Sequence, residues 1–203
     1  ASSGLRGPGS AYRYSSLSRH WRPQFALPEN GPKGLEESAY WFDIQGLRVV
    51  SLNSNERIAE QAKWVDAVLA DNPNPWTIVT FHHPVFSTKA SRDNPEVRRN
   101  WKPVFDRRRG DLVLQGHDHA YGRFTDGAER NVPTGAAARS GESGTVYVVS
   151  VSGPKMYDLQ RAPNMRRAAE NTQLYQVVSI DGAKLRYEAR TAKSGLYENQ
   201  AKV

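Results

Sequence analysis

The amino-acid sequence contains no cysteine. The chain therefore offers no disulfide framework, no thiolate nucleophile and no cysteine-based zinc or iron–sulfur site. Any bound metal ion would need histidine, carboxylate, amide or tyrosine ligands. The cysteine count by itself leaves the cellular compartment open.

Long apolar runs are also missing. The longest ones, such as residues 145–151, fall far short of the ~20 residues that span a bilayer. The sequence therefore predicts no membrane span and no membrane partner. The chain has 203 residues, of which 38% are hydrophobic and 10% aromatic. This composition is typical of a globular protein with roughly one to one and a half domains.

Acidic residues are fewer than basic ones, with 21 Asp and Glu against 28 Lys and Arg, so the net charge is +7. The arginine clusters at 98–99, 107–109 and 166–167 are short and scattered. None alternates with aromatic residues in the way that a single-strand nucleic-acid platform requires. The scattered distribution of these arginines therefore disfavours a nucleic-acid partner. The positive net charge is still compatible with a cleft that attracts anionic substrates.

The order of periodic segments predicts an α/β layering with an antiparallel C-terminal end. The opening residues 1–11 are mostly small, polar and rich in glycine, and we expect residues 1–18 to form a flexible N-terminal segment. The turn signals Gln45-Gly46 and Asp181-Gly182 predict two hairpins. We expect strands at 39–44, 47–52, 77–81, 112–115, 145–151, 174–180 and 184–190, and helices at 55–70 and from 94 to the interruption at Pro103.

Four of the five histidines fall in two tight groups, His82-His83 and His117-Asp-His119. Each group follows directly on an apolar strand, where open α/β sheets collect their ligand-binding residues. Gly116 would give the backbone freedom to turn sharply before the second group. Either group alone is more often structural, but both together after neighbouring strands favour a metal site.

Several segments resemble the calcineurin-like metallophosphoesterases, and in particular the bacterial proteins of the purple acid phosphatase-like branch. The two histidine motifs carry the resemblance, and flanking segments extend it over about residues 19 to 198. The segments are Phe81–Pro84, Gly116–Arg123, His20–Pro32, Arg92–Pro95, Asp111–Gln115 and Gly144–Val149. The implied fold is part of a four-layer α/β/β/α metallophosphoesterase sandwich with mixed sheets and an antiparallel C-terminal portion.

The resemblance also implies roles for individual residues. His82 and His117 would bind one metal ion and His119 the other ion of a dinuclear site. His83 would lie beside the ligands. Arg92 stands where plant purple acid phosphatases have a histidine that contacts substrate, so it could hold a phosphate. The alternative is a loop arginine paired with its neighbour Asp93.

Two divalent or trivalent ions, of iron, zinc or manganese, would hold a phosphate ester and activate a water molecule for in-line attack. Such a mechanism needs no protein nucleophile, and the sequence has no Gly-x-Ser-x-Gly motif. The resemblance thus implies a metal-dependent phosphatase or phosphodiesterase with a phosphate-ester substrate. It also favours a periplasmic or secreted location.

The carboxylate and asparagine motifs of the family's N-terminal half are missing from this sequence. Gly110-Asp111 instead matches a structural aspartate of the family. Residues 19–203 therefore resemble the C-terminal half of a metallophosphoesterase domain, and the N-terminal half would be a partner. Without bridging carboxylates, three imidazoles can hold at most one open metal site. A non-catalytic fragment or pseudoenzyme that binds one divalent metal or an anion stays open as the alternative function.

Overall fold

The computed structural model describes residues 17–108, 110–125, 144–182, 184–191 and 195–202. Most of the expected flexible segment, residues 1–18, lies outside these ranges. The elements are α1 (Trp21–Gln24), β1 (Tyr40–Ile44), β2 (Leu47–Ser51), α2 (Ile58–Ala70), β3 (Trp76–Phe81), α3 (Pro95–Arg108), β4 (Leu112–Gln115), β5 (Tyr121–Thr125), β6 (Val146–Val149), β7 (Met165–Ala169), β8 (Leu174–Asp181), β9 (Lys184–Thr191) and β10 (Gly195–Lys202). None of the helices within the described ranges is long and apolar enough to cross a bilayer.

The central element is a seven-stranded mixed sheet with strand order β1-β2-β3-β4-β6-β5-β7. β2, β3, β4 and β6 run parallel to one another. β1, β5 and β7 pair antiparallel with their neighbours. A separate antiparallel sheet has the order β10-β9-β8. The parallel strands bring their carboxyl ends to one edge of the sheet, where ligand sites of such sheets form.

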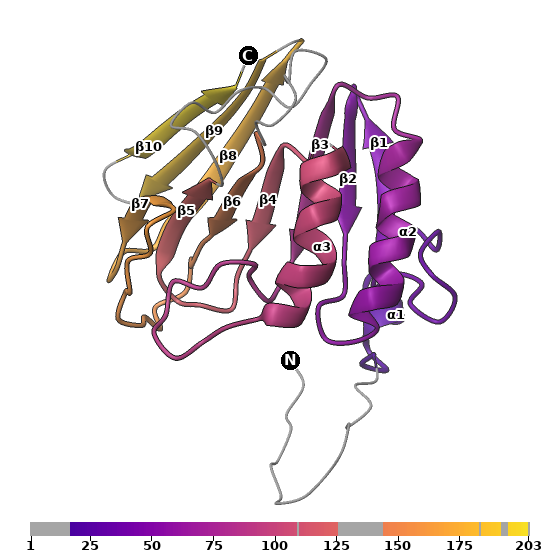
Figure 1. The fold of residues 1–203 in the computed structure, drawn as a ribbon, viewed down its shortest axis with the longest axis horizontal. Helices are drawn as coiled ribbons and strands as arrows, with labels where there is room; N and C mark the ends of the chain where they lie inside the picture. Colours follow the sequence, from indigo (N-terminus) through magenta and orange to yellow (C-terminus); the bar gives the residue numbers. More distant parts are fainter. Residues whose placement is uncertain (1–16, 109, 126–143, 183, 192–194, 203) are drawn as a thin grey trace, which may run out of the picture.

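Two apolar cores separate three layers. Helices α2 and α3 lie side by side over one face of the central sheet (Figure 1), and Val65, Trp101 and Phe105 are fully buried there. On the opposite face, Leu185 and Tyr187 of the small sheet pack in one cluster with residues of β3, β4 and β6. The order helices, large sheet, small sheet gives three layers of the expected α/β/β/α sandwich, and it confirms the predicted fold class.

The predicted N-terminal hairpin is confirmed. β1 and β2 pair antiparallel from Tyr40 opposite Ser51 to Ile44 opposite Leu47. The two turn residues, Gln45 and Gly46, have φ of 47° and 79°. Two consecutive left-handed residues form the turn that matches the twist of a two-residue hairpin.

The prediction that Pro103 interrupts the second helix is wrong. α3 continues through Pro103 to Arg108. A proline inside a helix removes one hydrogen bond and costs about 3 kcal/mol or more. Here Trp101, Val104 and Phe105 are all buried beside it, and burying a large apolar side chain contributes roughly 1.5–3 kcal/mol each. Tertiary packing on both sides of the proline therefore outweighs its local cost.

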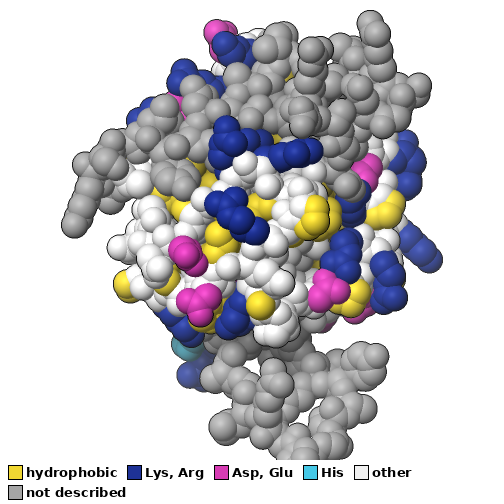
Figure 2. All heavy atoms as spheres, turned by 60° about the vertical axis from the view of Figure 1, so that its left-hand side comes forward, with side chains coloured by type: hydrophobic (Ala, Val, Ile, Leu, Met, Phe, Trp, Pro, Cys, Tyr) yellow, Lys and Arg dark blue, Asp and Glu magenta, His cyan; other side chains and the backbone are white. Residues whose placement is uncertain are grey.

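Basic side chains do not form one continuous stripe on the face shown in Figure 2. They lie in separate groups with acidic and apolar side chains between them. Arg107 and Arg108 form ion pairs with Asp66, and Arg98 forms one with Asp93. Arginines of two of the clusters are thus partly neutralised by ion pairs at the surface, and the absence of a nucleic-acid partner stays a prediction.

The ion pairs between α2 and α3 predict an acid-dependent loss of stability. Hydrogen bonds from Arg108 and Arg107 lower the pKa of Asp66 from 3.8 to about 2. A lowered carboxyl pKa contributes stability above pH 3.8, and this contribution is lost as the pH falls towards 2. Because Asp66 is 30% exposed, we expect Asp66→Asn to cost at most about 1 kcal/mol at pH 7. Urea unfolding at pH 7 and pH 3 should show the difference shrinking at the lower pH. An equal difference at both values would contradict the assignment.

Candidate metal centre

Two pairs of histidines lie at the carboxyl ends of neighbouring strands. β3 ends directly before His82 and His83, and β4 ends shortly before His117 and His119. The strands are parallel, and their last residues lie opposite each other. The amide of Gly116 donates a hydrogen bond to the carbonyl of His82 at 3.1 Å. The register therefore brings both loops to the same edge of the sheet, as the sequence predicts.

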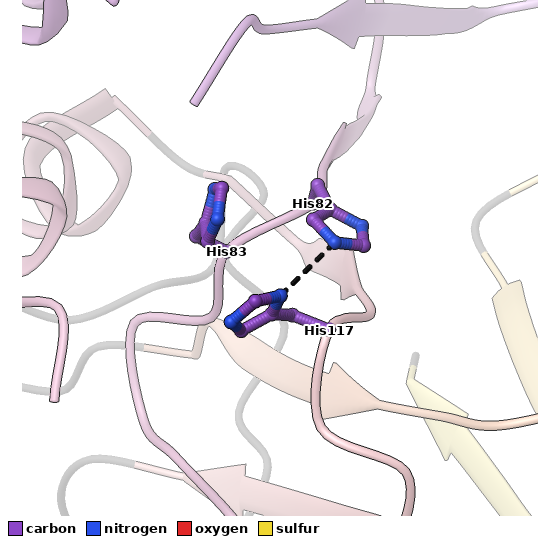
Figure 3. A group of neighbouring side chains, drawn as sticks. All are labelled: His82, His83 and His117. Atoms are coloured by element: carbon purple, nitrogen blue, oxygen red, sulfur yellow. Dashed lines mark hydrogen bonds between the residues drawn. The ribbon is translucent and has the colours of Figure 1, made fainter. Parts of the chain in front are cut away.

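Three of the imidazoles form one group. Each of His82, His83 and His117 offers a ring nitrogen, and these atoms all lie within 4.8 Å of one another. Nε2 of His82 lies 3.1 Å from Nδ1 of His117, and the ring centroids of His83 and His117 are 4.4 Å apart (Figure 3). The structure thus groups His83 with the two expected ligands of the first ion.

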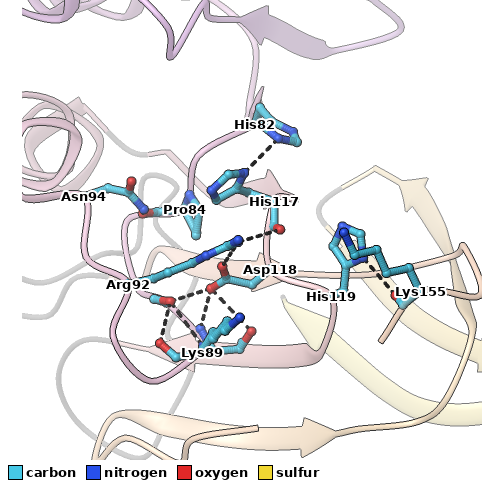
Figure 4. Close-up of polar contacts among 11 residues, drawn as sticks. His82, Pro84, Lys89, Arg92, Asn94, His117, Asp118, His119 and Lys155 are labelled. Atoms are coloured by element: carbon cyan, nitrogen blue, oxygen red, sulfur yellow. Dashed lines mark hydrogen bonds and ion pairs between the residues drawn. The ribbon is translucent and has the colours of Figure 1, made fainter. Parts of the chain in front are cut away.

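His119 lies outside this group, but its hydrogen bonding suits a ligand. Nδ1 of His119 lies 2.8 Å from the carbonyl oxygen of Lys155 (Figure 4). A carbonyl can only accept, so Nδ1 carries a proton, and Nε2 is the ring atom that can bind a metal ion. Histidines that bind metal ions usually donate their other ring nitrogen in this way.

The hydrogen bonding of His83 differs from that of His119. The buried hydroxyl of Ser54 accepts the backbone N–H of His83 at 3.0 Å and lies 2.9 Å from its Nδ1. Since this hydroxyl already accepts one hydrogen bond, its own proton is free to bind Nδ1. That tautomer leaves an N–H at Nε2, which donates a hydrogen bond and does not ligate a metal. This arrangement favours the expected place of His83 beside the ligands.

The pKa of each of the three grouped imidazoles is lowered, which favours the neutral form. Burial, followed by the charges of His83, Arg92 and His82, lowers the pKa of His117 to about 4. Burial is also the first cause that lowers the pKa of His82 and of His83. Neutral imidazole is the form that binds metal ions. The donor set therefore fits a metal ion with nitrogen ligands.

The loop that carries His117 has an unusual backbone. His117 has φ of 69°, and the amide of Asp118 donates to the carbonyl of Gly116 at 2.8 Å. This three-residue γ-turn with positive φ is rare and strained for a residue other than glycine. We expected Gly116 to provide the turn, but the left-handed residue is His117 itself. Strain of this kind persists only where the surroundings hold the residue in place.

Asp118 and Arg92 hold this turn. The carboxylate of Asp118 is 1% exposed and accepts hydrogen bonds from the hydroxyl of Ser87 and from the backbone N–H of Thr88, the latter at 2.8 Å. Arg92 donates to Oδ1 of Asp118 at 3.1 Å and to the carbonyl of His117 at 3.0 Å (Figure 4). The buried carboxylate thus joins the loop after β3 to the histidine loop after β4.

These contacts bear on the two alternatives for Arg92. Asp93 pairs with Arg98, and Arg92 pairs with Asp118. The role of Arg92 as a phosphate contact stays a prediction. The contacts of Asp118 and Ser54 with the histidine loops were not predicted from the sequence. The position of Asp118 between two candidate ligands was a signal for the first, whereas nothing local pointed to Ser54.

Comparisons with known proteins agree with this geometry. The family model of the calcineurin-like phosphoesterases matches residues 8–121. An uncharacterized protein of Mycobacterium tuberculosis is 29% identical over 124 residues, covering 51% of this chain and 23% of that protein. A probable purple acid phosphatase 20 of Arabidopsis thaliana is 25% identical over 122 residues, covering 55% of this chain and 28% of that protein. The matches thus span about a quarter of these relatives' length.

Solved structures show the same fold. A purple acid phosphatase from yellow lupin seeds superimposes with a TM-score of 0.67 at 21% identity, covering 88% of this chain and 34% of that one. The structure of PhoD gives a TM-score of 0.56 at 11% identity, covering 87% of this chain and 43% of that one. With more than half of its length matched by the family model, the chain belongs to the calcineurin-like phosphoesterase family.

Proposed function

We propose that this chain supplies part of the active site of a metal-dependent phosphatase or phosphodiesterase with a dinuclear metal site. The observation that carries the proposal is the convergence of His82, His83 and His117 at the ends of two parallel strands, with His119 presenting a free Nε2 nearby. Membership of a family whose members generally bind two metal ions supports it.

In this proposal His82 and His117 hold one ion and His119 holds the other, each ion being iron, zinc or manganese. Bound metal ions supply Lewis acidity and an activated water for attack on phosphorus. His83 donates from Nε2 to a phosphate oxygen of the substrate. Arg92 keeps its contact with the His117 carbonyl and can direct another guanidinium N–H to the phosphate.

The remaining ligands would come from outside residues 1–203, from the N-terminal half of the same domain. Asp118 is the carboxylate within the histidine loop, and its oxygens are already bonded to Ser87, Thr88 and Arg92. Imidazoles without a bridging carboxylate do not keep two cations close. The second ion therefore needs carboxylates from another segment.

Exposed apolar side chains near β1 and β8 support a docking site for the N-terminal half of the domain. Phe42 and Ile44 of β1 are 39% and 51% exposed. A hollow of about 530 Å³ lies between the hairpin and β8, lined among others by Leu47, Trp76 and Val178. β8 is also an edge strand of its sheet. An added strand could pair with β8 and cover these side chains. Export to the periplasm or medium is part of the same proposal.

The experiment that tests this function is a count of metal ions. The 203-residue chain, loaded with Zn²⁺ or Mn²⁺ and measured by plasma mass spectrometry, should retain at most one ion. When the N-terminal half is supplied, we expect two ions and hydrolysis of p-nitrophenyl phosphate. Metal binding without any hydrolysis in the complete protein would instead support the alternative of a pseudoenzyme that binds one divalent metal or an anion.

A further inference from the structure

The segment after β6 is attached to the histidine loop by backbone hydrogen bonds. The carbonyl of Lys155 accepts from Nδ1 of His119, and the amide of Tyr157 donates to the carbonyl of His119 at 2.9 Å. Further along, the amide of Gln160 donates to the carbonyl of Thr88 at 2.8 Å. The backbone of this segment is thus held beside His119 and beside the loop after β3.

Three cationic side chains gather around the ring of Tyr157. The ring stacks on His119 with centroids 4.5 Å apart and planes 23° apart. Nζ of Lys89 lies over the Tyr157 ring, 4.1 Å from its centroid. The guanidinium carbon of Arg92 is 5.0 Å and Nζ of Lys155 is 5.4 Å from the same centroid. The ring therefore collects cations beside a candidate metal ligand.

The charges of this cluster are not balanced. Arg92 forms an ion pair with the buried Asp118. Neither Lys89 nor Lys155 forms an ion pair with a carboxylate in the part of the chain that the structure describes. Two ammonium groups beside a reaction centre match the charge of one phosphate group, which is about −1.5 to −2 at pH 7. The charges of both ammonium groups are therefore available to an anion that binds beside His119.

We propose that Lys89, Lys155 and Tyr157 form a subsite for a second phosphate group of the substrate. The subsite lies beside His119, next to the position of the reacting phosphate in the proposed function, on which this inference rests. Lys89 and Lys155 bind the phosphate oxygens, and the phenol of Tyr157 donates a third hydrogen bond. The favoured substrates are organic phosphates with two phosphate groups, such as phosphoanhydrides, over simple monoesters.

The first test measures binding without hydrolysis. Inorganic pyrophosphate is titrated into the metal-free 203-residue chain by calorimetry, with EDTA present. We expect Lys89→Gln combined with Lys155→Gln to weaken binding at least about tenfold, since it removes two charge-assisted contacts. The matched control, Lys33→Gln with Lys63→Gln, removes the same charge from exposed positions and should change affinity less than about twofold. The pair Lys89→Arg with Lys155→Arg should retain most of the affinity.

The outcomes separate this inference from the proposed function. Equal weakening by both glutamine pairs would show a general charge effect and overturn the subsite, whether or not the complete protein hydrolyses esters. Selective weakening by Lys89→Gln with Lys155→Gln would support it even if hydrolysis fails. In the complete protein, this pair should lower kcat/KM for an alkyl diphosphate about tenfold and leave an alkyl monophosphate within about twofold. An equal fall for both substrates would contradict the second-phosphate role.

Discussion

Replacing His119 by alanine in the complete protein is expected to lower kcat for a phosphate ester about a thousandfold, because the variant loses a ligand of one of the two proposed ions. The structural basis is the free Nε2 that follows from the bond between Nδ1 and the Lys155 carbonyl. Metal analysis of the same sample should show the loss of about one of the two ions. The pair of measurements links the fall in turnover to the metal.

A matched control is available in the same chain. His20 is the fifth histidine of the sequence, and it is exposed at the start of α1 and belongs to neither strand-end loop. His20→Ala should keep both ions and full turnover. Undiminished turnover in His119→Ala, with His20→Ala behaving as wild type, would remove His119 from the ligand set. It would leave His82 and His117 as the histidine ligands of a single ion.

The sequence was sufficient to predict that the two histidine groups lie at the ends of neighbouring strands. It was not sufficient to predict the hydrogen bonds that these histidines form. The apolar run at 77–81 and the Leu112–Gln115 strand are local signals, and the parallel pairing follows from their order. The contact of Ser54 with His83 joins residues 29 positions apart, so no local pattern predicts it. The tautomers of His83 and His119 depend on such partners.

The unpredicted strand β5 and the unexpected continuation of α3 through Pro103 have the same origin, which is contact between segments that are distant in the sequence. The strand β5 was not predicted, because its sequence Tyr-Gly-Arg-Phe-Thr lacks an apolar alternation, although all five residues are buried. A Cβ on Gly122 would lie 2.5 Å from Cγ2 of Thr88. Glycine is needed there because the loop after β3 passes close by, a contact between distant segments. The helix through Pro103 likewise depends on packing that local propensity does not contain.

The second large effect is expected from Asp118→Asn. The carboxylate accepts from Ser87 and Thr88 through Oδ2 and from Arg92 through Oδ1. An asparagine must turn its NH₂ group towards one of these donors, and Arg92 loses its counter-charge. Breaking a buried ion pair in this way should lower the free energy of unfolding by about 3 kcal/mol. Urea unfolding measures the change directly.

The same substitution should also weaken metal binding, because Arg92 holds both Asp118 and the carbonyl of His117. Without these two hydrogen bonds from Arg92, the strained γ-turn can relax, and His117 can move away from His82. Loss of a partner that orients a ligand typically costs about 10–100-fold in metal affinity. The control is Asp93→Asn, which breaks an exposed arginine pair and should leave metal affinity unchanged. If Asp118→Asn lost stability but bound metal as tightly as wild type, Asp118 would hold the fold without positioning His117.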